Sequence, residues 1–277
     1  MQYHVDTHVH VYHCYEANAF LSRAVSNSRM MNPGATLILC LTESRGFDFF
    51  QELKTRAVDN NPISGWSASM IEGQPAVALN QADQNLIIIA GRQVITKQGL
   101  EVLALFNDLH YDDGLDIQVV IDKINENKGV AVLPWGVGKW LGKRGAVITG
   151  LLSANKPDRL AIADISTRPA LWPEPAQFRL ARHAGYACLY GTDPLPLHND
   201  QYRIASAGMR LELPTDPSQA VAELKTRLYR ITSKDKRGNN DENYFGSRVS
   251  VLHFFKDQLM LRFNRQSCLT EQVKADE

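Results

Sequence analysis

The segment QFRLARHAGYACLYGTD (residues 177–193) contains an amphipathic helical pattern, a stop, an apolar run and a turn, in that order. The helical pattern extends from Gln177 to Ala184 and ends at Gly185, a residue type favoured just after a helix. The compact run Tyr186–Tyr190 follows at once and predicts a buried strand. A helix that leads directly into a buried strand is typical of the crossover unit of a parallel sheet.

Similar units recur along the chain. Further compact runs predict strands at Gln2–Val9, Thr36–Leu41, Leu86–Ala90, Glu101–Phe106, Val130–Pro134 and Leu160–Ile165. Helices are predicted over residues 47–57 and 117–124, and Asp116 provides an N-cap for the second. Strands that alternate with helices favour an α/β fold, and we expect a seven-stranded parallel (β/α) barrel of the TIM type.

Two segments interrupt this alternation. Residues 63–79 predict an inserted β-hairpin that turns at Glu72-Gly73-Gln74. Residues 233–243 are polar and predict a loop, which precedes a last apolar helix at about 251–263. We expect disorder in the final ten residues. The sequence therefore predicts a single domain over 1–277, with a C-terminal extension from about residue 244.

The composition limits the classes of partner. The chain has 277 residues, a mass of 31.0 kDa and 44% apolar residues, enough for one large core. Thirty basic side chains balance thirty acidic ones, so we expect neither nucleic acid nor an acidic membrane as a partner. The N-terminus has no signal-peptide pattern, and nothing approaches 18 consecutive apolar residues. Four cysteines without a CxxC pair predict reduced thiols in a cytoplasmic protein.

Asp6, His8 and His10 alternate with apolar or small residues near the N-terminus. On an extended strand, alternate side chains point to one face, so the two imidazoles are expected to converge. Asp193 follows the strand Tyr186–Tyr190 at its carboxyl end. If both strands are parallel, Asp193 and the histidines lie at the same edge of the sheet. Imidazole and carboxylate together predict a metal site at that edge.

Ordered motifs along residues 1–200 resemble those of the PHP (polymerase and histidinol phosphatase) family. The segments are DTHVH (6–10), TES (42–44), LIIIAGRQVITKQGLEVLALF (86–106), GVAVLPWG (129–136) and GTDPLP (191–196). The resemblance implies a distorted seven-stranded α/β barrel, related in fold to metal-dependent amidohydrolases. It also implies two or three bound divalent ions and hydrolysis of phosphoesters.

The match to the family pattern is incomplete. His8, His10 and Asp193 occupy ligand positions of the family. The other positions differ: Glu43-Ser44 replace Asp-His, Gln93 replaces a bridging Glu, Glu101 stands where His is frequent, Pro134-Trp135 replace His-Pro, and Leu195 replaces the last His. We therefore expect one or two ions of zinc, manganese or iron, held by His8, His10 and Asp193, with Glu101 or Glu43 as further oxygen ligands.

The expected reaction is hydrolysis, of a phosphoester rather than an amide, by water that the metal activates. Asp193 or Glu101 would accept the proton of that water. An anionic small-molecule substrate would be bound by basic side chains in two loops that follow strands, namely Lys139, Lys143, Arg144 and Arg168. His13 and His198 are reserve ligands. Alternatives are a PHP-like barrel without catalytic metal that binds an anionic ligand or protein partner, or a structural subunit; the sequence does not predict the oligomeric state.

Overall fold

The computed structural model describes residues 1–229 and 243–264. Its strands are β1 (Gln2–Val9), β2 (Thr36–Leu41), β3 (Ser67–Met70), β4 (Ala76–Gln81), β5 (Gln84–Ile89), β6 (Gly91–Ile95), β7 (Glu101–Leu105), β8 (Val130–Pro134), β9 (Ala161–Ile165), β10 (Cys188–Gly191), β11 (Gly208–Glu212) and β12 (Tyr244–Phe245). Its helices are α1 (Ala17–Met31), α2 (Phe49–Asp59), α3 (Ile117–Glu126), α4 (Gly142–Ala154), α5 (Ala176–His183), the 3-10 helix η1 (His198–Arg203), α6 (Pro217–Arg227) and α7 (Val251–Asn264).

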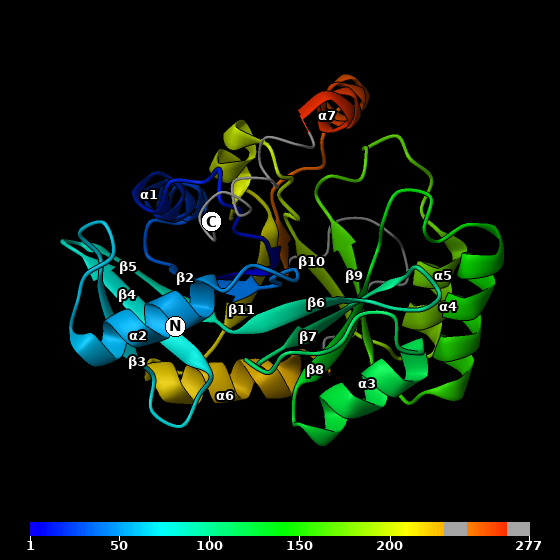
Figure 1. Ribbon diagram of the computed structural model, residues 1–277, viewed down its shortest axis with the longest axis horizontal. Coiled ribbons are helices and arrows are strands. Elements are labelled where there is room, and N and C mark those ends of the chain that lie inside the picture. Colours follow the sequence, from blue (N-terminus) through cyan, green and yellow to red (C-terminus); the bar gives the residue numbers. More distant parts are fainter. Residues whose placement is uncertain (230–242, 265–277) are drawn as a thin grey trace, which may run out of the picture.

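The strands form two mixed sheets with helices on their outer faces (Figure 1). One sheet has the order β12-β11-β1-β2-β5-β4-β3, and the other has the order β10-β9-β8-β7-β6. Helices α1 and α2 contact the first sheet, whereas α3 and α5 contact the second, and α4 packs on α5. The main apolar core lies between the two sheets, and a further apolar cluster lies under each helical layer.

Strand β2 illustrates why the central strands are apolar throughout. Ile38 and Cys40 pack into the core between the sheets, whereas Leu37, Leu39 and Leu41 pack toward the helices. All five side chains are almost fully buried. Because successive residues of a strand point to opposite faces, a strand buried on both faces reads as a continuous apolar run.

The predicted helices are confirmed. In α3, the buried residues Ile117, Val120, Ile121 and Ile124 form one face, and the Asp116 carboxylate accepts a hydrogen bond from Gln118 N at 2.9 Å. Spacings of three and four residues place these apolar side chains on the side that faces the sheet. Helices α2 and α5 begin and end within two residues of their predicted bounds.

The predicted TIM-like parallel barrel is wrong. The structure has two mixed sheets and no closed barrel among its described strands, and β7 runs antiparallel to both β6 and β8. Residues 96–100 connect β6 to β7, and such a short connection reverses the chain, whereas a parallel crossover needs a dozen residues or more. The sequence signal was Gly99, which adopts a φ of 67° in the turn between two apolar runs.

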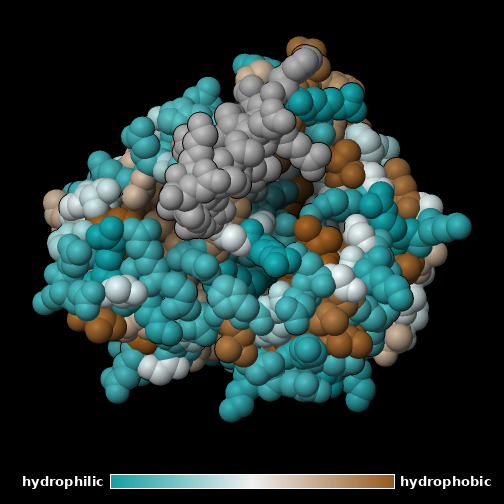
Figure 2. All heavy atoms as spheres, viewed as in Figure 1, coloured by the Kyte–Doolittle hydropathy of each residue, from teal (hydrophilic) through white to brown (hydrophobic). Residues whose placement is uncertain are grey.

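The remaining predictions concern the inserted hairpin, the loop at 233–243, the final ten residues and the last helix. Strands β3 and β4 pair antiparallel, and β4 pairs antiparallel with β5. The predicted loop at 233–243 and the final ten residues lie almost wholly outside the described residues. Helix α7 matches the predicted last helix and exposes Leu252, Phe255 and Leu259. Hydrophobic surface, brown in Figure 2, is visible at the top of the molecule, where Figure 1 places α7.

The structure bears on two further predictions, which concern membrane-spanning segments and the state of the cysteines. Within residues 1–229 and 243–264, no helix is both long and apolar enough to cross a membrane. Cys40 and Cys188 are buried free thiols, whereas Cys14 is disulfide-bonded. The prediction of reduced thiols is therefore wrong for Cys14.

Candidate metal centre

An irregularity in β1 sets the direction of the two histidines. The register with β2 shifts between Asp6 and Val9, so one extra residue of β1 is accommodated there. Tyr3 and Val5, which precede the shift, pack into the core between the sheets. Val9, which follows it, packs on the opposite side, toward the helices. A β-bulge of this kind redirects the side chains that follow it. His8 and His10 therefore do not continue the face of Asp6, as a regular strand would require.

The Asp6 carboxylate connects separate chain segments through hydrogen bonds. Its buried carboxylate accepts hydrogen bonds from the backbone N–H groups of His8 (3.2 Å), Thr192 (2.9 Å) and Ala205 (3.0 Å), and from the Thr192 hydroxyl (2.5 Å). Burial nevertheless raises the pKa of Asp6 to about 6, and these hydrogen bonds oppose the shift. Asp6 thus joins the end of β1 to the segments after β10 and before β11.

Asp193 reaches the histidines because β10 ends against β1. The Asp193 N–H donates to the His8 carbonyl at 2.9 Å, and Asp193 has a left-handed φ of 48°. Aspartate tolerates this conformation better than most residues. Gly191 permits the close approach, since a Cβ there would lie 2.6 Å from His8 N and 2.8 Å from Asp6 Oδ1.

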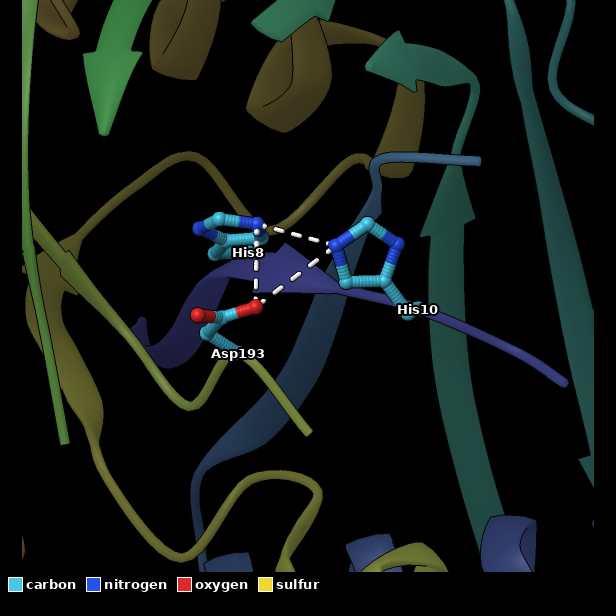
Figure 3. A group of neighbouring side chains, drawn as sticks. All are labelled: His8, His10 and Asp193. Carbon is cyan, nitrogen blue, oxygen red and sulfur yellow. Dashed lines mark hydrogen bonds and ion pairs between the residues drawn. The ribbon is translucent and has the colours of Figure 1, made fainter. Parts of the chain in front are cut away.

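Three donor atoms converge at this point (Figure 3). His8 Nε2 lies 3.1 Å from His10 Nε2, and Asp193 Oδ1 lies 3.4 Å from His8 Nε2 and 3.6 Å from His10 Nε2. Among the described residues, these three form the group of histidine, cysteine and acidic side chains that could hold a metal ion. Both imidazoles are buried, and the Asp193 side chain is 22% exposed. One side of the group is thus open to solvent.

The surroundings favour neutral imidazoles. Burial lowers the pKa of His8 to about 4 and that of His10 to about 3. Burial raises the pKa of Asp193 to about 6, and the nearby His10 opposes that shift. At pH 8 both rings are therefore neutral and the Asp193 carboxylate is ionised. These are the protonation states that bind metal ions.

The triangle of donor atoms fits a transition metal ion. Zinc binds nitrogen and oxygen at about 2.0–2.2 Å, so neighbouring ligands of a tetrahedral ion lie about 3.4 Å apart. The three observed separations of 3.1, 3.4 and 3.6 Å bracket that value. Of two neutral imidazole nitrogens that face each other, only one can donate a hydrogen bond. A cation would engage the lone pairs of all three donors at once.

Glu101 and Lys139 lie beside this group. Glu101 begins β7, and because β7 is antiparallel to β8, its first residue lies at the edge where β8 ends. Lys139 follows β8 and forms an ion pair with Glu101. The Glu101 charge raises the pKa of His8, and the Lys139 charge lowers it. Glu101 is thus near the donor group, and its carboxylate already has a cationic partner.

Glu43 lies elsewhere. Its buried carboxylate accepts a hydrogen bond from Phe50 N at 3.2 Å, in the first turn of α2, and Arg92 Nη1 lies 3.7 Å away. The two reserve histidines also have other partners: His13 stacks on Phe47, and His198 Nδ1 lies 3.0 Å from a backbone carbonyl oxygen. None of these three residues belongs to the donor group of the described chain.

Arg168 is a structural residue here. Its side chain is 1% exposed and donates two hydrogen bonds to Asp164, at 2.7 and 2.5 Å, and a third to the carbonyl of Trp172 at 3.1 Å. The charge of Arg168 is thus buried and paired, and its expected contact with substrate stays a prediction. Lys143 and Arg144 are exposed in the first turn of α4, and their predicted contact with substrate stays a prediction.

Comparisons with known proteins identify relatives by structure alone. No family model matches the chain, and no curated protein sequence matches it. PsfC from Pseudomonas syringae PB-5123 superposes with a TM-score of 0.57 at 17% identity, over 96% of this chain and 98% of that chain. Endonuclease Q, in complex with a 27-mer duplex substrate that carries an abasic lesion, superposes with a TM-score of 0.51 at 10% identity. That match covers 83% of this chain and 57% of the endonuclease.

These likenesses have two consequences. The predicted resemblance to PHP proteins is supported at the level of fold, and no family model confirms a PHP domain. The exclusion of nucleic acid is wrong, because a protein of similar fold binds a DNA duplex. A balanced net charge reports the sum over the whole surface, and it does not exclude a local basic site that contacts phosphates.

Proposed function

We propose that this protein is a metal-dependent phosphoesterase with a PHP-like fold. The observation that carries the proposal is the triangle of His8 Nε2, His10 Nε2 and Asp193 Oδ1, whose sides of 3.1 to 3.6 Å match the spacing of ligands around one ion. We accordingly propose these three residues as the ligands, without Glu101 and Glu43. Mixed nitrogen and oxygen ligands suit zinc, manganese or iron.

Each side chain has a distinct task in this proposal. The two neutral histidines and the Asp193 carboxylate hold the ion and leave one side open. When bound, a divalent ion lowers the pKa of water toward neutrality and polarises a phosphoryl oxygen. Asp193 Oδ2 and the Glu101 carboxylate are the candidates to accept a proton there. Lys139 carries a positive charge that acts on Asp193, and in this proposal it attracts a phosphate.

The metal-free alternative has less support. It relied on Lys139 and Arg168 as the residues that bind an anionic ligand. The Arg168 side chain is 1% exposed and already donates hydrogen bonds to Asp164 and to the Trp172 carbonyl, so it presents little surface to a ligand. A protein without metal would also retain two buried imidazole nitrogens that face each other at 3.1 Å. We therefore favour the metal-dependent function.

The first test is metal content. Purified untagged wild type should contain about one equivalent of zinc, manganese or iron by plasma mass spectrometry, and the variant His8→Ala/His10→Ala should contain none. His183→Ala is the matched control, because His183 is an exposed histidine of α5 whose Nδ1 lies 2.9 Å from the Arg179 carbonyl oxygen. Absence of metal from wild type, also after reconstitution with each ion, would refute the proposal.

The second test is activity. A panel of phosphomonoesters, phosphodiesters and duplex oligonucleotides should yield at least one substrate whose turnover requires the ion. The variant His8→Ala/His10→Ala should lose at least 100-fold in kcat/KM, whereas His183→Ala should match wild type. Metal-independent turnover, or turnover that survives the double substitution, would contradict a phosphoesterase at this centre.

A further inference from the structure

The ion pair between Lys139 and Glu101 occupies the space next to the donor group. Lys139 comes from the loop after β8, and its stem folds over Gly136, where an added Cβ would lie 2.8 Å from Lys139 Cδ. The Lys139 N–H also donates to the Gly136 carbonyl at 3.0 Å, which closes the loop. Trp140 anchors the same loop, since its indole N–H donates to the Pro134 carbonyl at 3.0 Å. The loop thus directs the ammonium group toward Glu101.

The charges of Lys139 and Glu101 act on the residues of the donor group. The Lys139 charge lowers the pKa of His8, His10 and Asp193, and the Glu101 charge raises the pKa of His8 and Asp193. The side chains of Lys139 and Glu101 are 32% and 18% exposed, so water screens them only in part. The charges of Lys139 and Glu101 therefore influence the edge of the centre.

A second divalent ion needs anionic ligands that this arrangement withholds. The Glu101 carboxylate binds the ammonium group of Lys139. Gln93, which hydrogen-bonds to His10, carries a neutral amide and provides no anionic bridge between two ions. Repulsion between a divalent ion and the ammonium group of Lys139 beside the centre also opposes a second ion.

We propose that Lys139 takes the place of a second metal ion at this centre and limits it to one ion. This inference rests on the proposed function, because it assumes that His8, His10 and Asp193 bind a metal. Lys139 neutralises Glu101 and keeps that carboxylate out of the ligand set. It also presents a positive charge to the substrate where a second ion would otherwise lie. Removal of the ammonium group releases Glu101 to bind a second ion.

The experiment measures metal stoichiometry. Wild type and Lys139→Met are equilibrated with saturating manganese at pH 8, gel-filtered into metal-free buffer, and analysed by plasma mass spectrometry and isothermal titration calorimetry. Wild type should bind one ion per chain and Lys139→Met should bind two. The variant Lys139→Met/Glu101→Gln should return to one, because it lacks the released carboxylate. Lys139→Arg, which keeps the charge, should also bind one.

Lys54→Met is the matched control. Lys54 forms an ion pair with Asp108 at 3.0 Å on α2 and is similarly exposed, so its loss should leave the stoichiometry at one. Circular dichroism verifies that each variant is folded. One ion on both wild type and Lys139→Met overturns this inference alone, and so do two ions on wild type. No ion on wild type overturns the proposed function and this inference with it.

Discussion

At the scale of single residues, Gly191 determines whether β10 can approach β1. A Cβ at this position would lie 2.6 Å from His8 N and 2.8 Å from Asp6 Oδ1, closer than real side chains approach. We expect Gly191→Ala to destabilise the protein by about 1–3 kcal/mol, the usual cost of overpacking, and to weaken metal binding at least tenfold. Urea unfolding and metal titration measure the two effects. Gly150→Ala in α4 is the control, because an added Cβ there contacts nothing.

Substitution of Arg168 tests whether this residue has a structural role or binds substrate. We expect Arg168→Met to destabilise the protein by about 3–5 kcal/mol, because it leaves the partly buried Asp164 without its bidentate partner and removes a fully buried side chain. Arg248 also donates to Asp164, at 2.7 Å, and compensates only in part from a more exposed position. Arg179→Met, an exposed arginine of α5, should have little effect on the same unfolding curves. A changed KM with unchanged stability would return Arg168 to the substrate site.

At the scale of an element, a buried carboxylate with a shifted pKa, that of Glu43, lies against the first turn of α2. Burial raises the pKa of Glu43 to about 7, while Arg92 and the N–H groups of Phe50 and Phe49 oppose the shift. An acid with a higher pKa in the folded state stabilises the fold fully below its unfolded pKa, and this contribution is lost as the pH rises through the folded value. The contribution of Glu43 therefore declines between about pH 4.5 and pH 7.

The corresponding prediction concerns the variant Glu43→Gln, whose side chain can still accept the hydrogen bond from Phe50 N. Between pH 5 and pH 8, wild type should lose up to about 3 kcal/mol more stability than the variant, as expected for a shift of a few pKa units. Urea unfolding in the presence of a chelator measures the difference without interference from metal. Parallel stability profiles of the two proteins would show that Glu43 does not titrate in this range.

At the scale of the whole molecule, the proposed metal connects distant parts of the chain. His8 and His10 follow the bulge of β1, and Asp193 follows β10, so folding must be complete before the three ligands meet. An ion at 100 times its Kd should stabilise the fold by about 2.7 kcal/mol. For a protein of this size, that corresponds to a rise in Tm of about 5–10 °C. Thermal unfolding with manganese and with chelator should show this difference, and His8→Ala/His10→Ala should not.

Elements that depend on local pattern could be predicted from the sequence. The apolar run of β2, the N-cap Asp116 of α3 and the glycine after α5 each have a physical cause within a few neighbouring residues. The proximity of His8 and Asp193 was also predicted, from the order of the strands and the positions of their ends. These features can be predicted without knowing which strands pair.

The register of β1 and the partners of the charged side chains could be known from the three-dimensional structure alone. The β6–β7 turn reverses β7, and this reversal places Glu101 at the edge where β8 ends, beside Lys139. The bulge in β1 separates Asp6 from the face of His8, although the sequence alternates regularly. The Arg168 guanidinium is buried and lies over the Trp135 ring, which is distant in the chain, although its ion-pair partner Asp164 is only four residues away. Pairing, register and burial result from contacts between residues far apart in the chain, and no local pattern encodes them.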